Sequence, residues 1–138
     1  MKVKKIVVCG SMDFLYHMSK WQARLKKMGY KVYIPKVVID NEFSLSSRNF
    51  EEWIRLKKQA TKLHLDKVKD ADIVLVVNEA KRRVKAYIGP STFSEIAYAN
   101  ALNLSHGKKI KIYLTNKLVK EGPFYAELQA WGVKKWPF

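Results

Sequence analysis

The segment 89–99 holds the residue types best suited to chemistry. Glu95 is the only acidic residue between positions 86 and 107, and this stretch contains no Lys or Arg, although the chain has 27 of them. Gly89, just before it, would let a ligand approach the backbone closely. A carboxylate placed there could attack an electrophilic carbon or stabilise a developing positive charge. Glu95 is therefore the first candidate for a catalytic residue.

A predicted helix over residues 91–104 would position this carboxylate. Ser91 and Thr92 open the helix, and its free N–H groups and dipole suit an anion. The same residues allow a structural interpretation, because Thr92-x-x-Glu95 matches a capping box, in which the Glu needs no further function. The local sequence by itself favours the capping box.

The remaining elements alternate between strands and helices. Apolar β-branched runs predict strands, and apolar residues at spacings of three and four predict helices. We expect strands at 5–10, 31–34, 72–77 and 110–114, an edge segment at 133–138, helices at 14–28, 49–69, 91–104 and 123–131, and a loop at 36–48. In the second helix, Trp53, Leu56, Ala60 and Leu63 share one stripe. This alternation predicts a single α/β domain over residues 1–138, with a parallel sheet covered on both faces.

Ligands of such sheets bind beyond the carboxyl ends of the strands. Asn78 ends the central strand and could bind a sugar hydroxyl or a base, or could simply form a turn. A basic cluster follows, which could bind a phosphate or form a solvated loop; it comprises Lys81, Arg82, Arg83 and Lys85.

Several classes of site are not expected. The chain has neither of the glycine-rich motifs that bind dinucleotides or nucleotide phosphates in many α/β proteins. Cys9 is the only cysteine, so we expect no disulfide within the chain and no cysteine-based zinc site. A thiol in an apolar strand is usually inert. We therefore expect no metal and no cofactor.

The length and charge restrict the protein further. No apolar run approaches the roughly 20 residues that span a membrane, so we expect a soluble cytoplasmic protein. The net charge of +15 raises the possibility of a nucleic-acid partner. Most of the positive charge comes from Lys, however, whereas specific nucleic-acid recognition relies on Arg. A solvated Lys-rich surface is the favoured interpretation, and a nucleic-acid partner is unlikely.

Three segments together resemble the nucleoside 2-deoxyribosyltransferase superfamily, which includes deoxynucleoside monophosphate N-hydrolases. They are Gly10-Ser11-Met12 after the first strand, Ala71-Asp72 opening a later one, and Gly89 with Ser94-Glu95-Ile96-Ala97-Tyr98-Ala99 before Lys108-Lys109-Ile110. The resemblance covers roughly residues 5 to 116. It implies a flavodoxin-like three-layer fold with about five parallel strands. It also implies cleavage or transfer of the N-glycosidic bond of a nucleoside or nucleoside 5′-monophosphate, by a homodimer or larger oligomer.

The resemblance also assigns residues. Glu95 would be the nucleophile that attacks the anomeric carbon. Two groups of residues would bind the substrate. The base and sugar would be contacted by Gly10, Ser11 and Met12. The sugar or a 5′-phosphate would be contacted by Gly89 and Ser91, with Thr92 beside them.

Two positions depart from the family pattern. Val7 stands where the family has a Tyr that orients the Glu, and His64 stands where it has an Asp. His64 could protonate the leaving base or could only pack its ring, and Tyr87 or Tyr98 could supply a phenol. A non-catalytic nucleotide-binding module of the same fold is the alternative function.

Overall fold

The computed structural model describes residues 2–36 and 50–138. Five parallel strands form one sheet in the order β2-β1-β3-β4-β5. The strands are β1 (Lys5–Gly10), β2 (Lys31–Tyr33), β3 (Ile73–Val77), β4 (Lys111–Leu114) and β5 (Lys134–Lys135). This is the flavodoxin-like strand order, so the expected fold class is confirmed.

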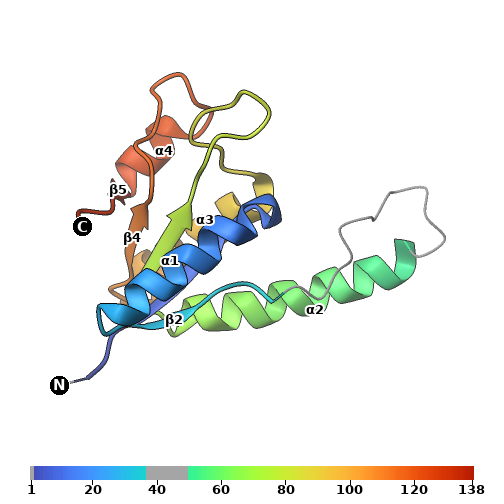
Figure 1. The fold of residues 1–138 in the computed structure, drawn as a ribbon, viewed down its shortest axis with the longest axis horizontal. Coiled ribbons are helices and arrows are strands. Elements are labelled where there is room, and N and C mark those ends of the chain that lie inside the picture. The colour runs from blue at the N-terminus through green and yellow to red at the C-terminus, as the bar shows by residue number, and fades with distance from the viewer. Residues whose placement is uncertain (1, 37–49) are drawn as a thin grey trace.

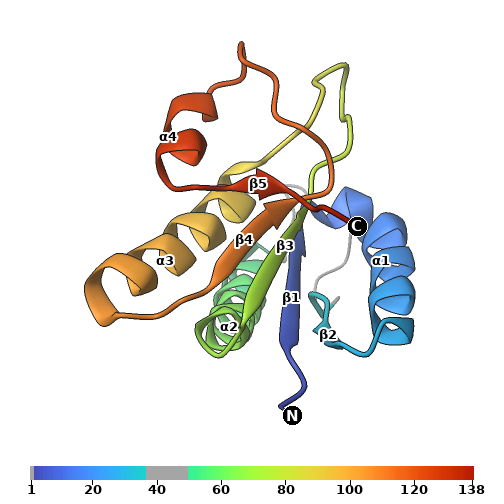
Figure 2. The same ribbon diagram turned by 90° about the vertical axis from the view of Figure 1, so that its left-hand side faces the viewer.

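Helices cover both faces of the sheet (Figures 1 and 2). The helices are α1 (Leu15–Lys27), α2 (Phe50–Lys69), α3 (Pro90–His106) and α4 (Tyr125–Ala130), and a 3₁₀ turn, η1 (Met12–Phe14), precedes α1. One apolar cluster lies between the sheet and α1, and a second lies between the sheet and the layer formed by α2, α3 and α4. The expected loop at 36–48, apart from residue 36, and the first residue of the helix expected at 49–69 lie outside the described residues.

Strand β3 lies at the centre of the sheet because its residues are apolar on both faces. All five of them, Ile73 to Val77, are buried. In β1 the side chains alternate: Ile6 and Val8 face α1, whereas Val7 and Cys9 face α2 and α3. This alternation decides which side chains of β1 can meet those of the two longer helices.

The C-terminal segment completes the core of its own chain. Strand β5 pairs with β4, and Trp136, only 5% exposed, packs edge-on against Tyr113 with ring centroids 5.1 Å apart. The sequence left open whether this aromatic end packs against its own chain or against another subunit. Trp136 packs against its own chain. No helix among the described residues is long and apolar enough to cross a membrane.

Candidate functional site

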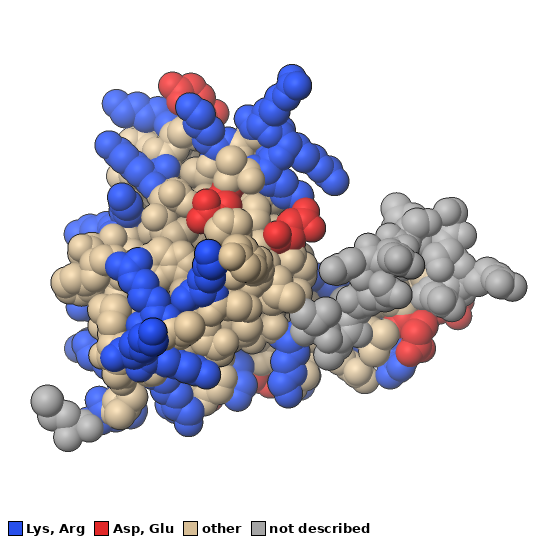
Figure 3. All heavy atoms as spheres, in the orientation of Figure 1, with Lys and Arg blue, Asp and Glu red and all other residues tan. Residues whose placement is uncertain are grey.

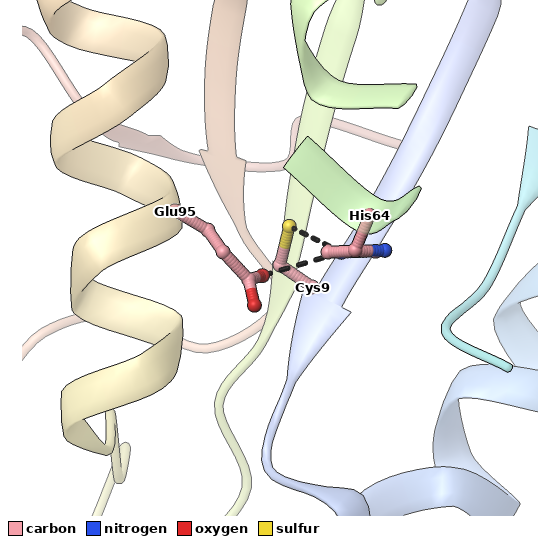
Figure 4. Close-up of side chains that lie close together, drawn as sticks. All are labelled: Cys9, His64 and Glu95. Atoms are coloured by element: carbon pink, nitrogen blue, oxygen red, sulfur yellow. Dashed lines mark hydrogen bonds and ion pairs between the residues drawn. The ribbon is translucent and has the colours of Figure 1, made fainter. Parts of the chain in front are cut away.

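Three side chains from three elements meet between the sheet and the α2–α3 layer. Cys9 comes from β1, His64 from α2 and Glu95 from α3, and their side chains point toward one another (Figure 4). The Nε2 atom of His64 lies 3.2 Å from Oε2 of Glu95 and 3.4 Å from Sγ of Cys9. The side chains of His64 and Glu95 are 10% and 16% exposed, and Cys9 is fully buried. We call these three residues the Cys-His-Glu cluster.

Each side chain of the cluster points inward because it lies on the buried face of its own helix or strand. His64 lies one turn before Val68, the buried anchor of α2, so both residues share the face turned to the sheet. Glu95 lies one turn before Ala99, which is also fully buried. Cys9 follows the alternation of β1. The cluster is therefore a consequence of three amphipathic patterns that converge at one place.

The start of α3 differs from the capping box suggested by the sequence. Gly89 is the N-cap and Pro90 the first helical residue, so Glu95 belongs to the second turn, and no side-chain cap bond forms. Pro is favoured at the first helical position because its missing N–H would have no helical partner there. The capping-box interpretation is therefore wrong, and the Glu95 carboxylate is directed toward the cluster instead.

The electrostatics of the cluster favour a neutral thiol beside the Glu95 carboxylate. Burial raises the pKa of the Cys9 thiol well above its usual value, and the negative charge of Glu95 raises that pKa further. Oε2 of Glu95 is buried and has no aligned hydrogen-bond donor, although Nε2 of His64 is close. A buried, under-satisfied carboxylate oxygen is costly, and such atoms are common where a ligand or a reaction supplies the missing partner.

Gly10, the last residue of β1, and the two residues after it lie where a ligand of this fold would be expected. Gly10 pairs with Val77, and a Cβ atom there would come within 2.9 Å of the Val77 carbonyl oxygen, so glycine is required by packing. The hydroxyl of Ser11 accepts a hydrogen bond from Nζ of Lys81 at 3.2 Å. Met12 is 36% exposed. Of these three residues, Ser11 and Met12 offer side-chain atoms to a substrate.

The residues at the start of α3 divide into accessible and inaccessible ones. Ser91 is exposed, whereas Thr92 is only 2% exposed and packs inward. A Cβ at Gly89 would lie 3.1 Å from the hydroxyl of Tyr87, so this glycine makes room for a neighbouring side chain. The structure thus leaves Ser91 available to a ligand and gives Thr92 a packing role.

Asn78 joins two neighbouring strands of the sheet at their carboxyl ends. Its side chain is fully buried. The amide nitrogen donates to the carbonyl of Asn116 at 2.9 Å, and the amide oxygen accepts from the Asn116 N–H at 2.8 Å and from the Thr115 hydroxyl at 3.2 Å. These bonds hold the end of β3 to the end of β4, and the sugar or base contact of Asn78 stays a prediction.

The basic cluster forms a tight turn between β3 and α3. Lys81 and Val84 exchange two backbone hydrogen bonds, of 3.0 and 2.9 Å, across Arg82 and Arg83, which both have positive φ. Nζ of Lys81 forms an ion pair with Asp13 at 2.8 Å, which ties this turn to the segment after β1. Arg82, Arg83 and Lys85 are exposed and open to an anion.

The two tyrosines considered as substitutes for the missing phenol have other surroundings. Tyr87 packs edge-on against Phe14, with ring centroids 6.3 Å apart, and the Lys81 ammonium lies 4.9 Å from its ring centre. Tyr98 lines an open groove between α2 and α3 with Thr61 and Leu65. The side chain that reaches Glu95 is instead His64.

Cys9 is the member of the cluster that sequence reasoning set aside. Its place two residues after Val7 in an alternating strand puts it on the same face of β1, which was a usable signal. Its proximity to His64, 55 positions further along, had no signal in the sequence.

Comparisons with protein-family models and with curated proteins find no match. Among solved structures, the chain is similar to a 2-deoxyribosyltransferase from the psychrotolerant bacterium Bacillus psychrosaccharolyticus, with a TM-score of 0.54 and 20% identity over 83% of this chain and 75% of the other. A β-glucosidase from Erythrobacter marinus matches with a TM-score of 0.35 and 14% identity, over 81% of this chain and 19% of the other, which is too weak to support an argument. The first similarity confirms the expected resemblance to the deoxyribosyltransferase superfamily at the level of the fold.

Proposed function

We propose that this protein breaks or transfers the N-glycosidic bond of a nucleoside or nucleoside 5′-monophosphate, with Glu95 as the nucleophile. The observation that carries the proposal is the buried Oε2 of Glu95, which lacks an aligned hydrogen-bond donor in a fold shared with a 2-deoxyribosyltransferase. A carboxylate held in this way is a competent nucleophile for an anomeric carbon.

The reaction would proceed in two displacements. A carboxylate oxygen of Glu95 forms a bond to C1′ of the sugar while the C1′–N bond breaks, and the base departs and takes up a proton. The resulting glycosyl ester is then attacked at C1′ by water, which gives the free sugar, or by a second base, which gives a new nucleoside. Both steps pass through an oxocarbenium-like state that the nearby carboxylate stabilises.

The short contact between His64 and Glu95 supports a positioning role for the imidazole. In retaining glycosidases the nucleophile and the proton donor lie about 5–5.5 Å apart, on opposite sides of the bond that breaks. The 3.2 Å contact of His64 with Glu95 is much shorter. We therefore favour a His64 that holds and orients the carboxylate, as the family's Tyr would, over a His64 that protonates the leaving base.

Arg82, Arg83 and Lys85 would favour a phosphorylated substrate. These cations stand exposed on the turn after β3, and this turn is joined to the segment after β1 by the Lys81–Asp13 ion pair. A 5′-phosphate is the substrate group that would attract them. A nucleoside 5′-monophosphate is accordingly our preferred substrate class.

The test is base release from a panel of nucleosides and their 5′-monophosphates. We expect activity in the wild type, and a loss of at least about 10³-fold in Glu95→Gln, because the amide keeps the shape and removes the nucleophile. His64→Gln should lower kcat more than it raises KM. Glu127→Gln, which changes an exposed carboxylate on α4, is the matched control and should be unaffected.

Mass spectrometry of the quenched reaction should locate the glycosyl adduct on the peptide that contains Glu95. Equal rates in wild type and Glu95→Gln would contradict the nucleophile. The absence of the Tyr phenol at Val7 favours one other function, a nucleotide-binding module without catalysis. That module would be stabilised by a nucleotide against heat, would release no base, and would still bind after Glu95→Gln.

A further inference from the structure

The Cys-His-Glu cluster brings three different ligand atoms together. Sγ of Cys9, Nε2 of His64 and a carboxylate oxygen of Glu95 all lie within 4.8 Å of one another. They come from a strand and two helices, so the distances among them are fixed by the core instead of by a loop. Figure 4 shows the three side chains pointing to a common centre.

The spacing of these atoms suits a tetrahedral metal ion. Zn²⁺ holds sulfur at about 2.3 Å, nitrogen at about 2.0–2.1 Å and oxygen at about 2.0–2.2 Å, so the ligand atoms of a tetrahedral site lie roughly 3.3–3.6 Å apart. The measured distances are 3.4 Å from Sγ to Nε2 and 3.2 Å from Nε2 to Oε2. The third pair, Sγ and the carboxylate oxygen, lies within 4.8 Å, so the three atoms could coordinate one ion after a side-chain movement of at most about 1.2 Å.

The surroundings also favour a cation. Oε2 of Glu95 is a buried oxygen without an aligned donor, and a metal ion would supply its partner. A thiolate and a carboxylate together carry two negative charges, which a divalent ion neutralises, so the complex would bury no net charge. The mixture of sulfur, imidazole and carboxylate is typical of zinc and its close analogues, whereas Mg²⁺ and Ca²⁺ prefer oxygen alone.

We propose that Cys9, His64 and Glu95 form a binding site for a divalent transition-metal ion of the zinc type. The thiol releases its proton to solvent as Sγ coordinates. Three protein ligands leave a fourth position for water or a small ligand, as in zinc sites that are not purely structural. The site shares two side chains with the proposed glycosyl-transfer site, so a bound metal would occupy the nucleophile and inhibit that reaction.

The test is titration of the metal-free protein with Co²⁺, without any nucleoside present. We expect one equivalent to bind, with a thiolate-to-cobalt charge-transfer absorption in the near ultraviolet, and Zn²⁺ should displace the Co²⁺ and abolish the absorption. Because no substrate is involved, this result is independent of the proposed function, and either proposal can fail while the other stands.

Variants identify the ligands. Cys9→Ser should abolish the charge-transfer band, and His64→Gln and Glu95→Gln should each weaken binding by more than the roughly 10–100-fold that the loss of an outer partner costs. His106→Gln, at an exposed position near the end of α3, is the matched control and should bind as the wild type does. Thermal unfolding curves show whether each variant is folded.

Two results would overturn the proposal. The first is a wild-type protein that shows no thiolate-to-cobalt band at a stoichiometric Co²⁺ concentration. The second is a band, or an affinity, that is unchanged in both His64→Gln and Glu95→Gln. The wild-type measurement decides the question by itself if every variant fails to fold.

Discussion

At the scale of single residues, the Glu95 carboxylate and the Cys9 thiol lie together in one buried place. Glu95 is the carboxylate that the sequence picks out, and Cys9 is the thiol whose pKa is raised by burial and by that carboxylate. His64 separates them, within 3.4 Å of both. The chemistry of the cluster therefore depends on which of the three holds a proton or a metal.

The raised pKa of Cys9 predicts a particular loss of stability at alkaline pH. The unfolded thiol ionises near pH 8.5–9, whereas the folded thiol stays protonated to a higher pH, so folding stability falls as pH rises above the unfolded value. Between pH 8 and 10, in a chelating buffer, the free energy of unfolding should fall faster in the wild type than in Cys9→Ala. The extra slope has a limit of about 1.4 kcal/mol per pH unit.

Urea unfolding at a series of pH values would measure this difference. Only the difference in slope matters, because Cys9→Ala also removes packing and lowers stability by a constant amount. The other ionisable groups are the same in both proteins, so their contributions to the slope cancel. Parallel curves for the two proteins would contradict the raised pKa.

At the scale of elements, the turn at Arg82 and Arg83 stores backbone strain. Both residues have positive φ, at 50° and 66°, in a two-residue turn of the kind that usually holds Asn-Gly. Side chains in this region cost roughly 1–2 kcal/mol each. Gly would adopt this backbone conformation with less strain than Arg. We therefore infer that the positive charge of the two Arg side chains has a function at this turn.

Relief of that strain should be measurable. We expect Arg83→Gly to raise the free energy of unfolding by about 0.5–1 kcal/mol, because the relief of strain exceeds the added freedom of the unfolded chain. Lys85→Gly is the matched control, since Lys85 is exposed and is not among the residues with positive φ. It should lower stability, by roughly 0.5–1 kcal/mol. A loss of stability in Arg83→Gly would refute this account.

The elements themselves were largely predictable from the sequence, but their contacts were not. Strand β3 was evident because an unbroken apolar run has no other place than the centre of a parallel sheet. The start of α3 was misassigned because Thr92 and Glu95 match a local capping pattern, while Gly89 and Pro90 compete for the same role and prevail. The bonds of Asn78 to Thr115 and Asn116 were not predictable, because a polar residue at a strand end looks the same whether it faces a ligand or a neighbouring strand.

At the scale of the whole molecule, the face drawn in Figure 3 is rich in positive charge. Figure 3 shows Lys and Arg over much of the visible face, between tan areas, with few acidic groups among them. A nucleic-acid reader would concentrate this charge in a stripe along one face. The solvated Lys-rich surface expected from the excess of Lys stays a prediction.

Helix α2 suggests where a second subunit would bind. Its N-terminal half extends past the edge of the sheet (Figure 1). On that half, Phe50 is 36% exposed, and Ile54, one turn later on the same face, is 46% exposed. Leu63, which the periodicity placed with the apolar stripe, is 51% exposed on the opposite face. Exposed apolar side chains that recur along one helix are typical of an interface.

We therefore predict a homodimer that uses α2. Light scattering after size exclusion should give twice the chain mass of 16.1 kDa. Ile54→Glu should give the single-chain mass, because a charge in an apolar interface is costly. Leu104→Glu, at a 78% exposed position on α3, is the control and should leave the dimer intact. A wild type with the single-chain mass would refute the dimer.

Cys9 is the only cysteine of the chain and is fully buried, so its chemical modification reports how often the surrounding structure opens. A reagent that modifies thiols can reach Cys9 only when β1 separates from the helices that cover it. The rate of modification in native buffer therefore gives the population of open molecules, residue-specifically and without an introduced label. A ligand that binds the closed form lowers the modification rate as its occupancy rises. The same rate measurement can therefore rank nucleosides, nucleotides and metal ions by affinity before any of them is tested as a substrate.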